Sequence, residues 1–140
     1  MTREEIQRFF ERRQDAIRRR DFEALTLLYA EDCIIESPLA GQVRGRAAIE
    51  NILRGMLDGF PDLVLENPQL LIDGDYAVQV VTLAGTNVGG FMNLPATGKR
   101  FELPLVSIFR FENGMVAHEK RVYDFTGMLL QTGVLKAKPI

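Results

Sequence analysis

The chain has 140 residues, enough for one domain with a sizeable core and too few for two ordinary ones, so we expect a single domain over residues 1–140. Charged residues make up 26% of the chain and its net charge is −2, which excludes a disordered chain and a strongly basic, nucleic-acid-binding one. The single cysteine excludes an internal disulfide, and no stretch approaches the roughly 20 apolar residues of a membrane span. The first residues also lack the apolar core of a signal peptide, so we expect a cytoplasmic location.

The first predicted element is a helix that begins at a capping box, in which Thr2 and Glu5 each satisfy a free backbone N–H group. Arg13 interrupts the apolar face of this helix. Either its aliphatic stem lies on the edge of the core with the guanidinium in water, or it is a cation that faces a pocket. The apolar face itself consists of Ile6, Phe9, Phe10 and Ile17.

A run of three arginines, Arg18 to Arg20, closes this helix and resembles a phosphate-binding cluster. Four acidic residues share the helix and no aromatic base-stacking pattern accompanies the run. We therefore interpret it as a solvated helix face and expect no nucleic-acid partner.

Asp21 is placed to cap a second, short helix over residues 22–29, which Tyr29 ends. Residues 33–37 then predict a short strand that Pro38 terminates. A third helix follows Gly45, and its unbroken helical spacing is the clearest in the chain, with apolar residues Ile49, Ile52, Leu53, Met56, Leu57 and Phe60.

From residue 63 onward the apolar period changes from helical to strand-like. Residues 63–72 and 76–86 predict two strands around the turn at residues 73–75, and residues 103–124 predict a second pair. Residues 125–132 suggest a last helical turn. A chain in which helices come first and antiparallel strands follow is typical of the α+β class.

The loop between the two strand pairs, residues 85–98, is rich in glycine. Its apolar residues Phe91, Met92 and Leu94 have two interpretations: a mobile lid, or a loop that packs on its own domain.

The last strand pair has a turn at residues 112–114 that suits a three-residue loop, which would pair Phe111 with Met115. A two-residue turn would shift this pairing by one residue. With the longer turn, one face carries Leu103, Leu105, Ser107, Phe109, Phe111, Met115, Ala117, Glu119, Arg121 and Tyr123, and the other carries Pro104, Val106, Ile108, Arg110, Val116, His118, Lys120 and Val122.

The first of these faces is apolar except for Ser107, Glu119, Arg121 and Tyr123, which gather at the end away from the turn. One interpretation is a structural ion pair that sets the register of the strand. In the other, Arg121 binds an anionic or carbonyl oxygen and Glu119 orients it or takes a proton. The adjacent arginine lowers the pKa of Glu119 and weakens it as a base.

Other polar residues are weaker candidates for the same pocket, which Leu105 would also line. The hydroxyl groups of Tyr29 and Tyr123 are possible donors to a ligand. Glu36 and Ser37 alternate along their strand, so only one of them faces the interior. No zinc spacing, phosphate-binding glycine motif or nucleophile elbow is present, so we expect no metal and no cofactor.

The opposite face of the strand pair holds the only histidine, His118, for which we expect a surface or interface position rather than a metal site. Val106, Ile108, Val116 and Val122 make this face more apolar than a solvated sheet face requires. We therefore predict a homodimer through the outer face of the sheet.

Two segments resemble the nuclear-transport-factor-2-like superfamily and, within it, the SnoaL-like group that contains polyketide cyclases. Residues 21–52 are similar to the helix, strand and helix pattern of ketosteroid isomerases, and residues 91–133 carry NLPATGKRFEL, SIFRFENGMV and DFTGMLLQTG, which resemble SnoaL-like signatures. The resemblance implies a cone-shaped, cystatin-like fold. In this fold a strongly bent, mainly antiparallel sheet wraps around the long first helix and encloses an apolar pocket, commonly in a dimer.

The same resemblance marks substitutions at the positions that carry catalysis in relatives. Ser37 stands where ketosteroid isomerases have their general base, and this favours Ser37 over Glu36 as the residue that faces the pocket. Arg13 stands where the same isomerases have an oxyanion-binding tyrosine. Arg121 stands where SnoaL-type cyclases and limonene epoxide hydrolases have an aspartate.

Two functions stay open. The first is binding of a small hydrophobic molecule that contains a carbonyl group and is polyketide-like or steroid-like. This binding is expected with or without isomerase, cyclase or hydrolase activity, and Arg121 and Glu119 are the catalytic candidates. The residues expected to contact the substrate are Ser107, Tyr123, Arg13, Ser37, Tyr29 and Leu105. The second is a non-catalytic binding or dimeric assembly module of the same fold.

Overall fold

The computed structural model describes residues 1–137. It begins with helices α1 (Arg3–Arg19) and α2 (Phe22–Thr26) and ends with helix α4 (Phe125–Gln131). Between them lie β1 (Tyr29–Ser37), β2 (Gly41–Arg44), α3 (Arg46–Gly59), β3 (Val64–Asp73), β4 (Tyr76–Thr86), β5 (Arg100–Glu112) and β6 (Met115–Val122).

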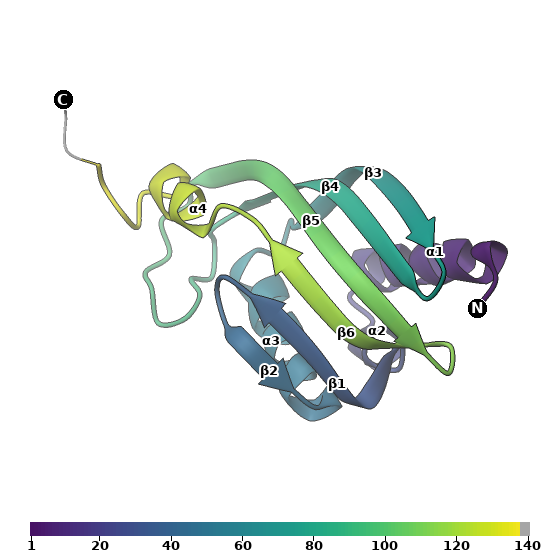
Figure 1. Ribbon diagram of the computed structural model, residues 1–140. Helices are drawn as coiled ribbons and strands as arrows, with labels where there is room; N and C mark the ends of the chain where they lie inside the picture. Colours follow the sequence, from purple (N-terminus) through teal and green to yellow (C-terminus); the bar gives the residue numbers. More distant parts are fainter. Residues whose placement is uncertain (138–140) are drawn as a thin grey trace.

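The strands form one sheet in the order β2-β1-β6-β5-β4-β3. Neighbours are antiparallel except β1 and β6, which run parallel. The helices α1, α2 and α3 lie on one side of the sheet, which curves around them and stays open at its edges (Figure 1). This arrangement confirms the predicted α+β class and the bent, mainly antiparallel sheet around the first helix.

The first helix begins where the capping box predicts. The N–H of Thr2 donates to Glu5 Oε2 at 2.8 Å, and the N–H of Glu5 donates to Thr2 Oγ1 at 3.1 Å. The predicted apolar face is buried, but so is Arg13, whose side chain is only 5% exposed. The interpretation that places its guanidinium in water is therefore wrong, because the interior offers this cation an acidic partner.

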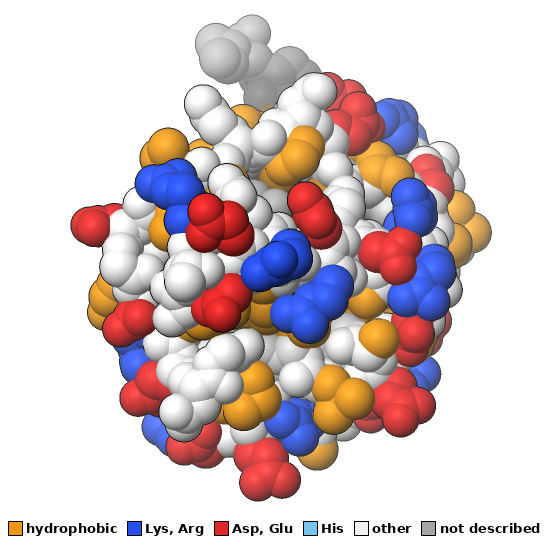
Figure 2. Space-filling model, turned by 90° about the vertical axis from the view of Figure 1, so that its right-hand side faces the viewer, with side chains coloured by type: hydrophobic (Ala, Val, Ile, Leu, Met, Phe, Trp, Pro, Cys, Tyr) orange, Lys and Arg blue, Asp and Glu red, His pale blue; other side chains and the backbone are white. Residues whose placement is uncertain are grey.

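The surface holds acidic and basic side chains close together. Arg19 Nε donates to Asp15 Oδ2 at 2.8 Å, and Arg18 binds the other oxygen of the same carboxylate. On the face at the free end of α1, acidic and basic side chains are interspersed and neither sign forms a large patch (Figure 2). At the other end of α1, Arg18 and Arg19 are exposed and Arg20 is partly exposed, so the arginine run is part of a solvated face, as predicted. No described helix is long and apolar enough to cross a membrane.

The second helix is shorter than predicted, because Tyr29 starts β1 instead of ending the helix. Tyr29 pairs with Val116 of β6, and its carbonyl oxygen accepts hydrogen bonds of 3.0 and 2.6 Å from the guanidinium of Arg46. These long-range contacts override the local helical pattern. Strand β2 was not predicted; it returns along β1 and pairs Ser37 with Gly41, whose φ is +65°.

The third helix and the first strand pair match their predictions. Helix α3 starts after Gly45 and ends at Gly59, two residues before Pro61. Strands β3 and β4 form a hairpin in which Asp73 pairs with Tyr76. The strand pattern that begins near residue 63 is therefore confirmed.

The last hairpin, β5–β6, has a two-residue turn, so the predicted pairing of Phe111 with Met115 is wrong. Asn113 and Gly114 both have positive φ, +52° and +76°, and Glu112 pairs with Met115. A bulge then shifts the register by one, and Phe109 pairs with Glu119 and Ser107 with Arg121. The bulge restores the predicted inward face of Glu119 and Arg121.

One residue of the predicted outer face is on the inside. Val116 precedes the bulge, pairs with inward-facing Phe111 and is fully buried. The core around it is aromatic: Phe9 and Phe111, and Phe10 and Phe109, meet edge to face with ring centroids 4.9 Å apart. These contacts join α1 to the inner face of the sheet.

Candidate functional site

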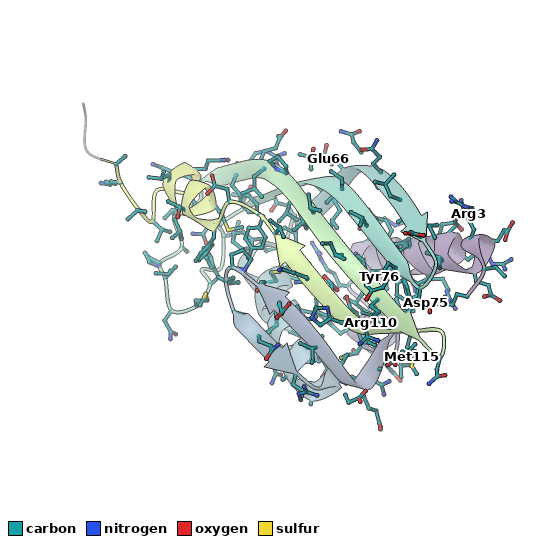
Figure 3. The ribbon with its side chains drawn as sticks, viewed as in Figure 1. Arg3, Glu66, Asp75, Tyr76, Arg110 and Met115 are labelled. Carbon is teal, nitrogen blue, oxygen red and sulfur yellow. The ribbon has the colours of Figure 1, made fainter. Side chains whose placement is uncertain are left out.

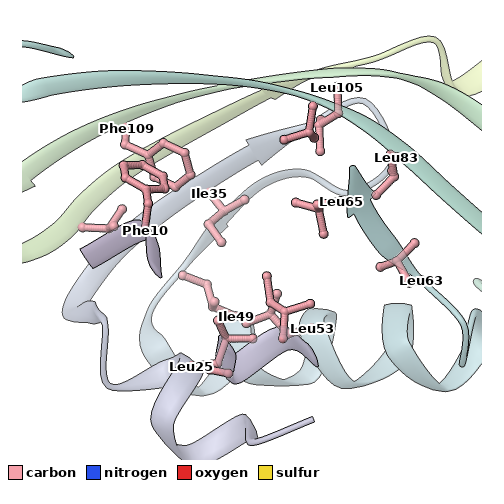
Figure 4. Close-up of a cluster of buried hydrophobic side chains, with 14 of the residues drawn as sticks. Phe10, Leu25, Ile35, Ile49, Leu53, Leu63, Leu65, Leu83, Leu105 and Phe109 are labelled. Atoms are coloured by element: carbon pink, nitrogen blue, oxygen red, sulfur yellow. The ribbon is translucent and has the colours of Figure 1, made fainter. Parts of the chain in front are cut away.

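A cavity of about 50 Å³ lies between α1, α3 and the inner face of the sheet. This volume holds a few water molecules and is smaller than the about 300–1,000 Å³ of most small-molecule sites. Several of its leucines converge on one space in Figure 4. The apolar lining consists of Ile17, Leu25, Leu39, Ile52, Leu53, Met56, Leu57, Phe60, Leu63, Leu65, Leu83, Phe91, Phe101, Leu105 and Met128.

A surface groove of about 520 Å³ between α3 and the loop at residues 87–99 opens beside this cavity. The cavity and the groove share five lining residues, namely Leu39, Ile52, Met56, Phe60 and Phe91. These shared residues form the boundary between the two spaces, and the volume of the groove falls within the range of small-molecule sites. We call the cavity and the groove together the interior pocket.

The loop beside the groove is held in place by Asn87, which is fully buried. Its side-chain amide donates to the carbonyl of Pro95 at 3.0 Å and accepts from the N–H of Gly90 at 3.1 Å. Phe91 is buried against the pocket, whereas Met92 is 55% exposed. The loop thus packs on its own domain through Phe91, the second of the two interpretations above.

Four polar side chains line the cavity among the described residues: Arg13, Ser37, Arg121 and Tyr123. They come from α1, from the end of β1, from β6 and from the segment just after β6. Glu36 points to the other side of the sheet, where its carboxylate lies 3.2 Å from His118 Nε2. The alternation in β1 therefore directs Ser37 inward, as predicted.

Behind these lining residues, Glu119 is the centre of a buried network. One carboxylate oxygen binds the Nε of Arg121 and lies 3.8 Å from a terminal nitrogen of Arg13. The other oxygen accepts a hydrogen bond from the hydroxyl of Tyr29, which in turn accepts one from the Nε of Arg13 at 3.4 Å. The carboxylate is fully buried, so all of its contacts are within the protein.

The charges of this network follow from its geometry. Burial opposes ionisation of Glu119, but Arg121 and Arg13 outweigh it and hold the pKa of the carboxyl below its usual value. Burial, reinforced by the Glu119 charge, raises the pKa of Tyr29, and burial also raises the pKa of Tyr123. At neutral pH the site therefore contains one carboxylate, two guanidinium groups and two neutral phenols.

The predicted site residues thus divide into two layers. Arg13, Ser37, Leu105, Arg121 and Tyr123 line the cavity, whereas Glu119, Tyr29 and Ser107 do not. Ser107 is 3% exposed and lies beside Arg121 in the β5–β6 ladder. The hydrogen-bonding groups on the cavity surface are mainly donors, and they suit a ligand oxygen that carries or develops negative charge.

Sequence reasoning missed the residues that α3 and α4 contribute, above all Met56 and Met128. Met56 belongs to the regular apolar stripe of α3, which signalled burial but not a pocket. Its sulfur lies 3.9 Å from the Nη1 of Arg121, so it covers the end of the guanidinium. No group of three or more His, Cys, Asp or Glu side chains suited to a metal ion is present among residues 1–137.

The sequence matches the family described as SnoaL-like polyketide cyclase over residues 6–132. No curated protein has a significantly similar sequence. Among solved structures, TsrD from Streptomyces laurentii is 28% identical, with 96% of this chain and 99% of that chain covered and a TM-score of 0.84. AclR, a candidate hydroxylase from Streptomyces galilaeus, is 26% identical, with 99% and 91% covered and a TM-score of 0.82.

A third structure shows the likeness in fold alone. It is a protein with a ketosteroid isomerase-like fold from Catenulispora acidiphila, in complex with trimethylamine, and it is 17% identical. The alignment covers 89% of this chain and 92% of that chain, with a TM-score of 0.73.

Proposed function

Because this chain belongs to the SnoaL-like polyketide cyclase family, we propose that its interior pocket binds a small hydrophobic molecule that carries a carbonyl group. The apolar lining from α1, α3 and the sheet supports a hydrophobic body, polyketide-like or steroid-like. The family membership supports a reaction of the cyclase or isomerase type.

The observation that carries this proposal is the position of Arg121. Its Nε is bound to Glu119, its Nη1 lies 3.9 Å from the sulfur of Met56, and both Arg121 and Met56 line the cavity. Sulfur is a weak acceptor, so a carbonyl oxygen of a ligand would be the better partner. Arg121 would then orient the carbonyl group and stabilise negative charge on its oxygen.

In this proposal Glu119 is a positioning residue and not the base. Its carboxylate is fully buried behind Arg121, and its oxygens are engaged by Arg121, Arg13 and Tyr29. The neutral hydroxyls of Ser37 and Tyr123 complete the polar lining and add donors for the same oxygen.

Binding can be tested with 2-acetylnaphthalene, a hydrophobic aryl ketone, by isothermal titration calorimetry. We expect Arg121→Gln to weaken binding by about tenfold, the equivalent of one hydrogen bond to a charged group. The matched control is Arg110→Gln, which removes a guanidinium from the outer face of the same hairpin, where Arg110 pairs with Glu112 at 3.5 Å. Equal affinities of the two variants, or a wild type that binds neither this ketone nor the corresponding carboxylic acid, would refute the proposal.

Non-catalytic binding is the second candidate, and one observation favours it. None of the described residues that line the cavity is a carboxylate or a histidine, so a ligand held there by Arg121 meets no ordinary general base among them; the groove adds the carboxylate of Asp58. The two candidates differ in deuterium exchange at the methyl group of the bound ketone in D₂O. Exchange that the wild type accelerates and Arg121→Gln does not would indicate catalysis, and binding without accelerated exchange would indicate a binding protein.

We further propose a cytoplasmic homodimer that forms through the outer face of the sheet. On this face Val78 pairs with Ile108, and Val106 pairs with Val80 and Val122. Tyr76 and Arg110 lie at its border (Figure 3). Val116 is buried and does not contribute, but the remaining apolar side chains are half-exposed or exposed and form a continuous strip.

A further inference from the structure

We infer that the ligand of the interior pocket is an acid whose single negative charge lies between Arg13 and Arg121. This inference rests on the proposed ligand-binding function and names the class of its ligand: a monocarboxylate, or an equally charged enolate, on a hydrophobic body.

The first support is a count of buried charge. Among the described residues, the buried charged side chains are Arg13, Arg121 and Glu119, with side-chain exposures of 5%, 6% and 0%. Two cations therefore share one anion, which leaves one positive charge uncompensated in the interior. An uncompensated buried charge is costly, and a bound anion would remove that cost.

The second support is that the other contacts of the two cations are with neutral groups. Arg13 contacts the hydroxyl of Tyr29 and lies over the ring of Phe109, with its Cζ 5.1 Å from the ring centroid. Arg121 contacts Met56. No second carboxylate lies within 4.0 Å of either guanidinium in residues 1–137.

The third support is that both cations line the cavity whereas their shared carboxylate does not. The excess charge thus faces the space that a ligand would occupy. A carboxylate fits two guanidinium groups through charge-assisted hydrogen bonds, while the apolar lining holds the rest of the molecule. A neutral ketone would satisfy donors but leave the charge, and a phosphate dianion would overcompensate it.

The test compares naphthalene-2-carboxylate with 2-acetylnaphthalene at pH 7, because the two differ in charge but hardly in shape. We expect the wild-type protein to bind the acid at least about tenfold more tightly, as calorimetry measures, since an ionic partner strengthens a hydrogen bond substantially. Acetate, which has the charge without the rings, should not compete at equal concentration.

Two variants test which guanidinium group produces the preference for the acid over the ketone. Arg13→Met leaves one cation and one anion, so the preference for the acid should disappear, whereas Arg110→Gln should retain it. Equal affinity for acid and ketone in the wild type would overturn the inference and leave the proposed function intact. Binding of neither compound would overturn both, and acetate competing as well as naphthalene-2-carboxylate would show a bare anion site and overturn the inference.

Discussion

Glu119→Gln is expected to destabilise the protein more than Arg121→Met, although these two side chains form one ion pair. Glutamine keeps the shape of the side chain but leaves Arg13 and Arg121 together without a buried counter-charge, and removal of one partner in this way costs about 3–5 kcal/mol. After Arg121→Met, the carboxylate keeps Arg13 at 3.8 Å and the hydroxyl of Tyr29. The cost should then be one charge-assisted hydrogen bond, about 1.5–3 kcal/mol.

The measurement is urea denaturation followed by far-UV circular dichroism, since the chain contains no tryptophan. The difference between the two variants should be about 2 kcal/mol at pH 7, which is the difference between the midpoints of these two ranges. Equal costs, or a greater cost for Arg121→Met, would refute the count of buried charge.

The pH dependence adds a check with a definite sign. The folded-state pKa of Glu119 lies below its ordinary value of 4.5, so its ionised form stabilises the protein fully above that pH. This contribution is lost as the pH falls from about 4.5 through the lowered folded-state pKa. The stability difference between the wild type and Glu119→Gln should therefore narrow on acidification, and a difference that widens would contradict the assignment.

Two further predictions concern the loop at the pocket entrance and the outer face. A Cβ at Gly59 would lie 2.5 Å from the carbonyl oxygen of Gly90, so Gly59→Ala should cost about 1–3 kcal/mol in the same assay. On the same helix Gly55 has open space, and Gly55→Ala should stabilise by about 0.5–1 kcal/mol; equal effects would contradict the close packing of α3 on the loop. The homodimer is tested by light scattering after size exclusion. The wild type and Leu27→Asp, which changes the helical side, should give twice the monomer mass, whereas Ile108→Asp should give the monomer mass. A monomeric wild type at micromolar concentration would remove the homodimer proposal.

The sequence predicts the elements whose signals are local. The capping box at Thr2 and Glu5 positions the start of α1, and the unbroken apolar spacing around Leu53 identifies α3. Tyr29 is assigned wrongly because its surroundings are set by Arg46 and Val116, which local propensity does not include. Local periodicity is a good guide only where no distant partner competes with it.

The site was predictable in part for the same reason. The alternation along β6 groups Glu119 with Arg121 correctly, since both lie on one strand. The burial of Arg13 could not be derived, because the carboxylate that compensates it comes from the other end of the chain. The division of the polar cluster into lining residues and residues behind them depends on the curvature of the sheet, which no pattern in the sequence specifies.

The bulge in β6 has a consequence for how this hairpin can vary. It places one more residue on β6 than on β5 between the pairs Phe111–Val116 and Arg110–His118, so Ala117 has no partner in the ladder. Deletion of Ala117 would leave Phe109 opposite Glu119 and Ser107 opposite Arg121, whereas deletion of Lys120 would turn Arg121 out of the interior. The inward orientation of Glu119 and Arg121 therefore does not depend on the presence of Ala117, but it does depend on the number of residues between Glu119 and Arg121.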